Sequence, residues 1–144
     1  MRTMSRLFPL GLFFVWIGTV ESAPAEGTPS AVVTPVLSAT TTPSGQPIRF
    51  PSGDGRVIVS TYVIAPGSSL PVHKHPYPRY AYVLEGHLRV TDTDTGQSWD
   101  YQAGDFVVEV VDQWHFGEAI GTGPVRLLVI DCVPKAEAGN TVKK

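Results

Sequence analysis

Short runs of β-branched and aromatic residues recur from Gln46 onward, and a cluster of turn-forming residues ends each run. Runs at this regular spacing, with no convincing helical periodicity, predict the strands of an antiparallel sandwich or barrel. The predicted strands are residues 48–50, 56–64, 80–84, 87–91, 97–101, 106–111, 115–119 and 125–133. The 144 residues leave room for one domain, so we predict a single all-β domain over residues 46–134.

The segments that flank this domain differ from it in composition. Residues 26–45 are rich in Pro, Thr, Ser, Ala and Val and are predicted to be extended or flexible, with residues 32–37 forming an edge strand that Pro35 interrupts. Residues 135–144 are predicted to be a flexible C-terminal tail. Within the domain, the apolar run 125–133 is predicted to be a central strand covered on both faces.

The first 25 residues have the features of a secretory signal peptide. Arg2 and Arg6 precede an apolar run from Leu7 to Val20, and small residues follow, with cleavage expected after Ala25. The run is short for a membrane span, so the chain is expected to have no stable membrane anchor after cleavage. An uncleaved N-terminal anchor is the alternative interpretation. These features predict a periplasmic or secreted protein.

The charge balance and the cysteine count limit the kinds of molecule that the protein is expected to bind. After removal of residues 1–25, nine basic and twelve acidic residues remain, and this balance argues against binding to nucleic acid or to an anionic membrane. Cys132 is the only cysteine, so no intramolecular disulfide can form, and we interpret it as a packing residue of a strand. The expected partner is therefore a small molecule.

Three of the four histidines form a pattern typical of a metal site. In a β-strand, residues two apart project from the same face, so His73 and His75 place two imidazoles side by side. His115 follows another predicted strand and completes a three-nitrogen set if the strands fold together. Three protein ligands with an open position are typical of a catalytic divalent metal. The sequence therefore predicts a site for Fe, Mn, Ni or Zn at His73, His75 and His115.

The glycines around these histidines carry a family resemblance. Five residues separate Gly67 from His73, and six residues separate Arg79 from Gly86. This spacing resembles the first motif of the cupin superfamily, G-x5-H-x-H-x3/4-E-x6-G, and Gly104 with His115 resembles the frame of the second, G-x5-P-x-G-x2-H-x3-N. The resemblance is to the small secreted single-domain cupins of bacteria. It implies a jelly-roll-like barrel of antiparallel strands with the histidines in its lumen, and it makes a homodimer plausible.

The chain departs from the family motifs at four positions. Arg79 stands where the family carries a metal-binding glutamate, and Val110, Asp112 and Ala119 replace the proline, second glycine and asparagine of the second motif. A divalent ion held by three neutral imidazoles keeps its full charge, whereas a carboxylate would cancel part of it. Such a site favours an anionic ligand.

Arg79 leaves three interpretations open. If its side chain points into the lumen, a carboxylate-bearing ligand would have to lie between the guanidinium and the metal. If it points to solvent, the site is a three-histidine one, of a kind known among thiol dioxygenases of the cupin family. In the third interpretation the barrel is degenerate, and the histidines are hydrogen-bonded lumen residues without metal.

Two further residues are candidates for ligand binding. Glu109 would be costly to bury alone, so it either faces water or pairs with Arg79 or the metal. Tyr80 either packs in the barrel wall or orients a ligand through its phenol. We predict a metal-dependent cupin that acts on or binds a small, anionic molecule, with an oxygenase or isomerase role implied only by the resemblance. The alternative is a non-catalytic module that binds or senses a small ligand in a metal-free site.

Overall fold

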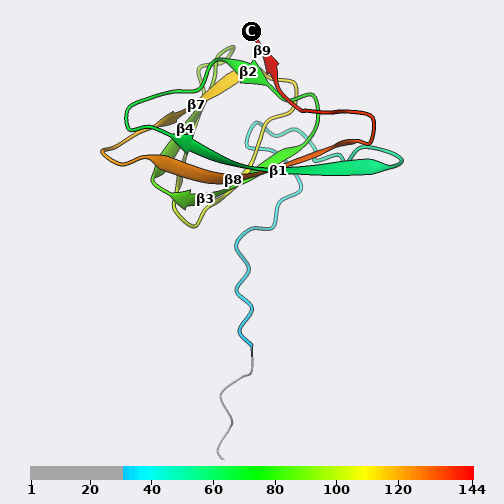
Figure 1. Ribbon diagram of the computed structural model, residues 1–144, viewed down its shortest axis with the longest axis horizontal. Coiled ribbons are helices and arrows are strands. Elements are labelled where there is room, and N and C mark those ends of the chain that lie inside the picture. The colour runs from blue at the N-terminus through cyan, green and yellow to red at the C-terminus, as the bar shows by residue number, and fades with distance from the viewer. Residues whose placement is uncertain (1–30) are drawn as a thin grey trace, which may run out of the picture. The chain divides into compact units, whose positions relative to one another are not determined.

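Two antiparallel sheets make up the fold that a computed structural model describes for residues 31–144 (Figure 1). All strands lie in one compact unit, Thr34–Lys144; residues 31–33 belong to a separate N-terminal unit and are exposed. The predicted signal peptide, residues 1–25, lies outside the described residues. Within the described part of the chain, no helix is long and apolar enough to cross a membrane.

The first sheet has four strands in the order β1-β8-β3-β6, and Figure 1 shows β1, β8 and β3 side by side. Its strands are β1 (Gly55–Ile64), β8 (Val125–Pro134), β3 (Arg79–Glu85) and β6 (Phe106–Val108). The second sheet has five strands in the order β5-β4-β7-β2-β9. They are β5 (Ser98–Gln102), β4 (His87–Asp92), β7 (His115–Ala119), β2 (His73–Lys74) and β9 (Val142–Lys143).

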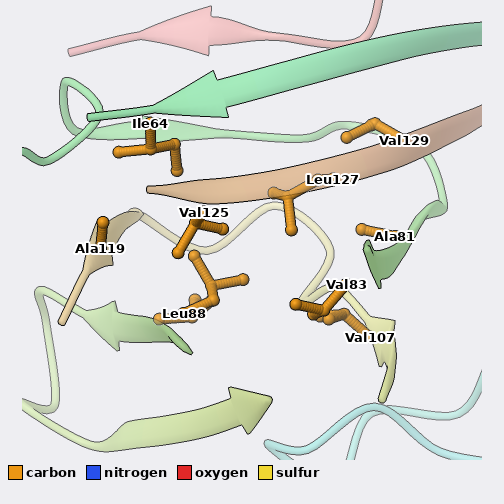
Figure 2. Packing of buried hydrophobic residues seen from close by; sticks show 10 residues of the cluster. Ile64, Ala81, Val83, Leu88, Val107, Ala119, Val125, Leu127 and Val129 are labelled. Carbon is orange, nitrogen blue, oxygen red and sulfur yellow. The ribbon is translucent and has the colours of Figure 1, made fainter. Parts of the chain in front are cut away.

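The predicted all-β fold is confirmed, with one difference in its closure. Strand pairing does not join the two sheets into a closed barrel; instead they pack against each other through an apolar core. Side chains from both sheets meet in this core, as Figure 2 shows. Its buried members are Ile64, Ala81, Val83, Leu88, Val90, Val107, Ala119, Val125, Leu127 and Val129.

Alternation along β8 corrects the prediction that this strand is covered on both faces. Its residues alternate between buried positions and half-buried or exposed ones, from the fully buried Val125 to the exposed Arg126 and onward. Strand β8 is nevertheless central, because it pairs with β1 over ten residues on one side and with β3 on the other. One face therefore packs in the core, and the other forms part of the outer surface of the sheet.

Two strands that the sequence predicted are absent from the described residues. Residues 48–50 form no strand, and residues 32–37 are exposed and carry none; the first part of the domain holds only an isolated bridge between Thr41 and Pro47. Pro47 and Pro51 flank the run 48–50, and a proline has no N–H to donate to a neighbouring strand. The run therefore joins no sheet.

The C-terminal segment is not the flexible tail that was predicted, because part of it forms strand β9. Strand β9 pairs with β2 in the register Lys143 to His73 and Val142 to Lys74, so the chain end lies beside β2 (Figure 1). Asn140 is 3% exposed. No sequence pattern predicted the pairing of this segment, because a two-residue strand has no readable periodicity.

The backbone has a positive φ at the motif positions Gly86 and Asp112. Gly86 separates β3 from β4 with a φ of +86°, and a Cβ at this position would collide with the carbonyl oxygen of Pro124. Asp112 replaces the family's second glycine yet keeps a positive φ of 55°. Aspartate tolerates this left-handed conformation better than most residues. The turn before His115 is thus retained without its glycine.

Candidate metal centre

Pairing between β2 and β7 brings the three predicted metal ligands together. His73 on β2 lies directly opposite His115 on β7, and His75 follows two residues after His73. The three ring centroids are 4.6 to 4.9 Å apart, and the potential ligand atoms all lie within 4.8 Å of one another. All three side chains are buried. A contact across 40 residues of sequence thus forms the cluster that the motif spacing predicted.

A backbone carbonyl fixes the orientation of each imidazole. The Nδ1 atoms of His73, His75 and His115 lie 2.7, 2.7 and 2.8 Å from the carbonyl oxygens of Pro71, Asn140 and Gln113. A carbonyl oxygen only accepts hydrogen bonds, so each Nδ1 carries the proton and each Nε2 keeps its lone pair. Metal-binding histidines are typically held in this way. The three Nε2 atoms therefore form a donor set suited to one transition-metal ion.

Glu109 lies beside this cluster, at the end of β6. Its Oε2 atom is 3.2 Å from Nε2 of His115, and its side chain is 12% exposed. Both of these atoms are buried and have no hydrogen-bond partner among residues 31–144. Buried polar atoms without partners are rare in folded proteins and indicate that a group completing them is absent. The residues present therefore fit a bound metal ion.

Arg79 points inward but is neutralised by a protein carboxylate. Its Nε and Nη2 atoms donate to the two carboxylate oxygens of Asp131 at 2.7 and 2.8 Å, and Nη2 also donates to Thr141 at 3.1 Å. Both side chains of the pair are 6% exposed. Nη1 of Arg79 is 3.5 Å from Nε2 of His75. Of the interpretations left open, the one in which Arg79 points to solvent is wrong, and in the inward-facing one Asp131 balances the charge without a ligand.

The burial of the site shifts the pKa values of its metal-free form. Burial lowers the pKa of His75 to about 4 and also lowers that of His73. Burial alone would lower the pKa of His115 and raise that of Glu109. Their proximity outweighs this effect, so the pKa of His115 is raised and that of Glu109 falls to about 2. Without a metal, the pair is stabilised as imidazolium and carboxylate.

Asn140 ties the C-terminal segment to the site. Besides the contact of its carbonyl oxygen with His75, its side-chain Nδ2 donates to Asp131 at 2.8 Å and to the carbonyl of Tyr77 at 2.9 Å. Sequence reasoning missed Asp131, Asn140 and Thr141. A readable signal existed for Asp131, because a charged residue inside the apolar run 125–133 must find a buried partner.

Tyr80 does not reach the histidine cluster. It follows Arg79 on β3, so its side chain projects from the opposite face of the sheet and stacks on Phe106 with ring centroids 6.0 Å apart. There it lines an outer hollow of about 500 Å³ that includes none of the three histidines. Tyr80 therefore lies in the wall, away from the histidines, as the packing alternative has it, and a role in ligand binding stays a prediction. Tyr62, which sequence reasoning missed, lines the inner cavity instead.

A hollow of about 200 Å³ leads from the surface to the cluster. It shares four lining residues, among them His73 and Arg79, with a cavity of about 20 Å³ that Glu109 and His115 also line. The lining residues of the larger hollow are Tyr62, Leu70, Pro71, His73, Arg79, Thr141 and Lys143. The geometry thus combines three neutral nitrogen ligands with space for a small molecule.

Comparison with solved structures identifies proteins of similar fold. The oxalate decarboxylase of Lactobacillus farciminis in complex with formate has a TM-score of 0.53 and 23% identity, over 60% of this chain and 26% of that one. The polyketide cyclase RemF of Streptomyces resistomycificus has a TM-score of 0.51 and 22% identity, over 67% of this chain and 66% of that one. Another oxalate decarboxylase structure has a TM-score of 0.51 and 26% identity, over 60% of this chain and 23% of that one. This chain thus spans about a quarter of the length of the oxalate decarboxylases.

Comparison with protein families gives the assignment. No curated protein matches the chain. Residues 60–131, half of the chain, match the Cupin domain. This match includes both histidine motifs, and the structure folds them into one buried cluster between two antiparallel sheets. The chain therefore belongs to the cupin superfamily.

Proposed function

We propose that this protein is a secreted cupin that holds one divalent transition metal at His73, His75 and His115 and binds or transforms a small anionic molecule there. The observation that carries this proposal is the set of three Nδ1–carbonyl contacts, which turn three buried Nε2 lone pairs toward one another. When bound, such an ion supplies Lewis acidity and open coordination positions. Iron, manganese, nickel and zinc all accept imidazole ligands.

The hollow beside the cluster supports an anionic ligand. Lys143 lines it and has no ion-pair partner among the described residues, whereas the charge of Arg79 is balanced by Asp131. Tyr62, Leu70 and Pro71 add apolar surface to the same hollow. We infer a small carboxylate whose anionic end lies near the metal or Lys143. The oxalate decarboxylases of similar fold act, by their name, on a small carboxylate, which supports the same ligand class.

One observation favours a second function. Glu109 and His115 can form an ion pair without metal, since the pKa of His115 is raised, chiefly by Glu109 against the effect of burial. The alternative is therefore a non-catalytic module that binds or senses a small ligand in a metal-free site.

Metal content decides between these functions. Tag-free protein reconstituted with Fe²⁺, Mn²⁺, Ni²⁺ or Zn²⁺ and then desalted is expected to retain about one ion per chain by elemental analysis. The variant His75→Ala should lose the ion, while His87→Ala, which removes the one histidine outside the cluster, should keep it. Circular dichroism of both variants verifies their folding. Wild-type protein that retains no ion would favour the metal-free module.

The ligand class and the export of the chain have tests of their own. Oxygen uptake with small carboxylates distinguishes an oxygenase from a binding protein, and Lys143→Ala should weaken carboxylate binding in either case.

We further propose that residues 1–25 direct the chain to the periplasm or the medium. N-terminal sequencing of protein from these fractions is expected to begin at Glu26.

A further inference from the structure

Glu109 occupies a defined place relative to the family's metal-binding position. Strands β3 and β6 are antiparallel neighbours, with Tyr80 opposite Val108. The next position of this ladder sets Arg79 opposite Glu109, and the N–H of Glu109 donates to the carbonyl of Arg79 at 3.0 Å. Opposite residues of an antiparallel pair project from the same face of a sheet. Glu109 therefore presents a carboxylate one strand away from the position where the family carries its glutamate.

The contact between Glu109 and His115 requires a positive charge between two acceptors. Because Gln113 fixes the proton of His115 on Nδ1, its Nε2 faces the carboxylate with a lone pair. Two such atoms repel each other unless a proton or a metal ion lies between them. Two ligand atoms that each lie about 2.1 Å from one ion are about 3.0–3.4 Å apart in octahedral or tetrahedral geometry. The observed separation of 3.2 Å falls within this range.

The Arg79–Asp131 pair leaves Glu109 free to bind. The hydrogen bonds of the Arg79 guanidinium go to Asp131 and Thr141, with one longer contact to His75, and none goes to Glu109. A buried carboxylate is costly unless a cation or hydrogen bonds satisfy it. Oε2 of Glu109 has no hydrogen-bond partner among the described residues, although Glu109 lies 3.2 Å from His115 and lines one cavity together with His73 and His115.

We propose that Glu109 is the fourth protein ligand of the metal, so that this chain carries the metal-binding carboxylate directly after β6 instead of on β3. The inference rests on the proposed three-histidine site and deepens it. Glutamate cancels one unit of the divalent charge, which leaves the centre with a net charge of about +1 for an incoming anion. Arg79, paired with Asp131, stands at the motif position where the family carries its glutamate.

Titration of the metal-free protein with Co²⁺ tests this proposal. Calorimetry measures the binding, and the visible absorption reports the coordination of the bound ion. Glu109→Gln keeps the shape of the side chain but not its charge. It is expected to bind Co²⁺ at the three histidines with a Kd raised at least about tenfold and with a shifted absorption band. Glu118→Gln, a carboxamide substitution on β7 outside the cluster, is the matched control and should match the wild type.

The outcomes separate the two proposals. Wild-type protein that binds no Co²⁺ would overturn the three-histidine site itself. Wild-type and Glu109→Gln proteins with the same Kd and the same absorption band would overturn only the role of Glu109. If Glu109→Gln does not fold, Glu109→Asp serves in its place, because it keeps the charge on a side chain one methylene shorter. Its Kd should exceed that of the wild type, and an unchanged Kd and spectrum would count against the fourth ligand.

Discussion

Arg79 shows how a cation can stand where the family carries a metal-binding anion. A guanidinium next to a divalent ion is unfavourable unless an anion compensates it, and Asp131 does so through two parallel hydrogen bonds. Asn140 donates to the same Asp131 oxygen that accepts from Nε of Arg79. The three residues thus form a closed polar network beside the histidines. The arginine in the motif is therefore neutralised by a carboxylate of the neighbouring strand β8.

Breaking this buried pair is expected to destabilise the fold. Arg79→Met leaves the Asp131 carboxylate buried without its cation, which should lower the free energy of unfolding by about 3–5 kcal/mol. The double variant Arg79→Met/Asp131→Asn should recover part of this loss, because it removes the uncompensated charge. Urea denaturation at pH 7 measures both changes.

The matched control for this prediction is Arg89→Met. Arg89 and Asp100 form the same two-bonded arrangement, with distances of 2.7 Å, but their side chains are 40% and 42% exposed. Solvent screens an exposed pair, so the control should change the urea midpoint little. Equal effects of Arg79→Met and Arg89→Met would contradict the structural importance that burial gives to the Arg79–Asp131 pair.

At the scale of strands, the sequence predicted long elements well and short ones poorly. The bounds of β7 were predicted as observed, and those of β1, β4 and β8 within one residue at each end, because each alternates or carries a long β-branched run. β9 has two residues and exists through its pairing with β2, almost 70 positions earlier in the chain. No local pattern encodes such a partner. The two carbonyl groups that orient His73 and His115, by contrast, come from residues two positions away.

The turn between β4 and β5 offers a test of pH dependence. Asp92 is 2% exposed, and its Oδ1 accepts from the N–H groups of Asp94 and Thr95 at 2.9 and 2.8 Å. Burial alone would raise the pKa of Asp92, but these hydrogen bonds outweigh it and lower the pKa below its ordinary value of 3.8. A lowered pKa means that the ionised group stabilises the folded state at neutral pH and loses this contribution as the pH falls through the folded-state pKa.

Removing the charge of Asp92 should therefore destabilise the folded state only at a pH at which the carboxylate is ionised. Asp92→Asn keeps an acceptor oxygen in the turn and is expected to lower the free energy of unfolding by about 1–2 kcal/mol at pH 7. The difference from the wild type should stay constant down to about pH 5 and shrink below pH 3.8. Urea denaturation across this range measures it, with Asp94→Asn, an exposed neighbour in the same turn, as control. A difference that does not change with pH would show that the charge of Asp92 does not contribute.

At the scale of the whole molecule, the motif spacing predicted the histidine cluster, whereas the network around it required the fold. The spacing of His73 and His75 predicted two neighbouring imidazoles, although β2 ends at Lys74 and His75 lies just beyond it, and the motif frame supplied His115. Glu109 was named as a candidate because a buried carboxylate needs a partner, but its contact with His115 depends on how the chain passes from the end of β6 in one sheet to β7 in the other. Asp131 lies on β8, and the adjacent Asn140 and Thr141 directly precede β9, so these residues meet only through the register of β8 and the return of the chain to β9.

The exposed edge of β1 is a candidate interface for the expected homodimer. β1 is an edge strand of ten residues, and no strand pairs with its second edge within the described part of the chain. Val57, Val59 and Val63 on its outer face are 65%, 57% and 69% exposed. A long, apolar edge is a template for pairing, and the small net charge of −2 opposes it little. We propose that two copies pair through β1.

Light scattering coupled to size-exclusion chromatography tests this dimer over a range of concentrations. The wild type is expected to have twice the chain mass at high concentration. Val59→Lys places a charge on the edge strand and should shift the protein to the monomer, because lysines on edge strands oppose pairing. Thr95→Lys adds the same charge in the exposed turn between β4 and β5 and should leave the mass unchanged. A wild-type protein that stays monomeric at every concentration would show that solvent, and not a second copy, covers this edge.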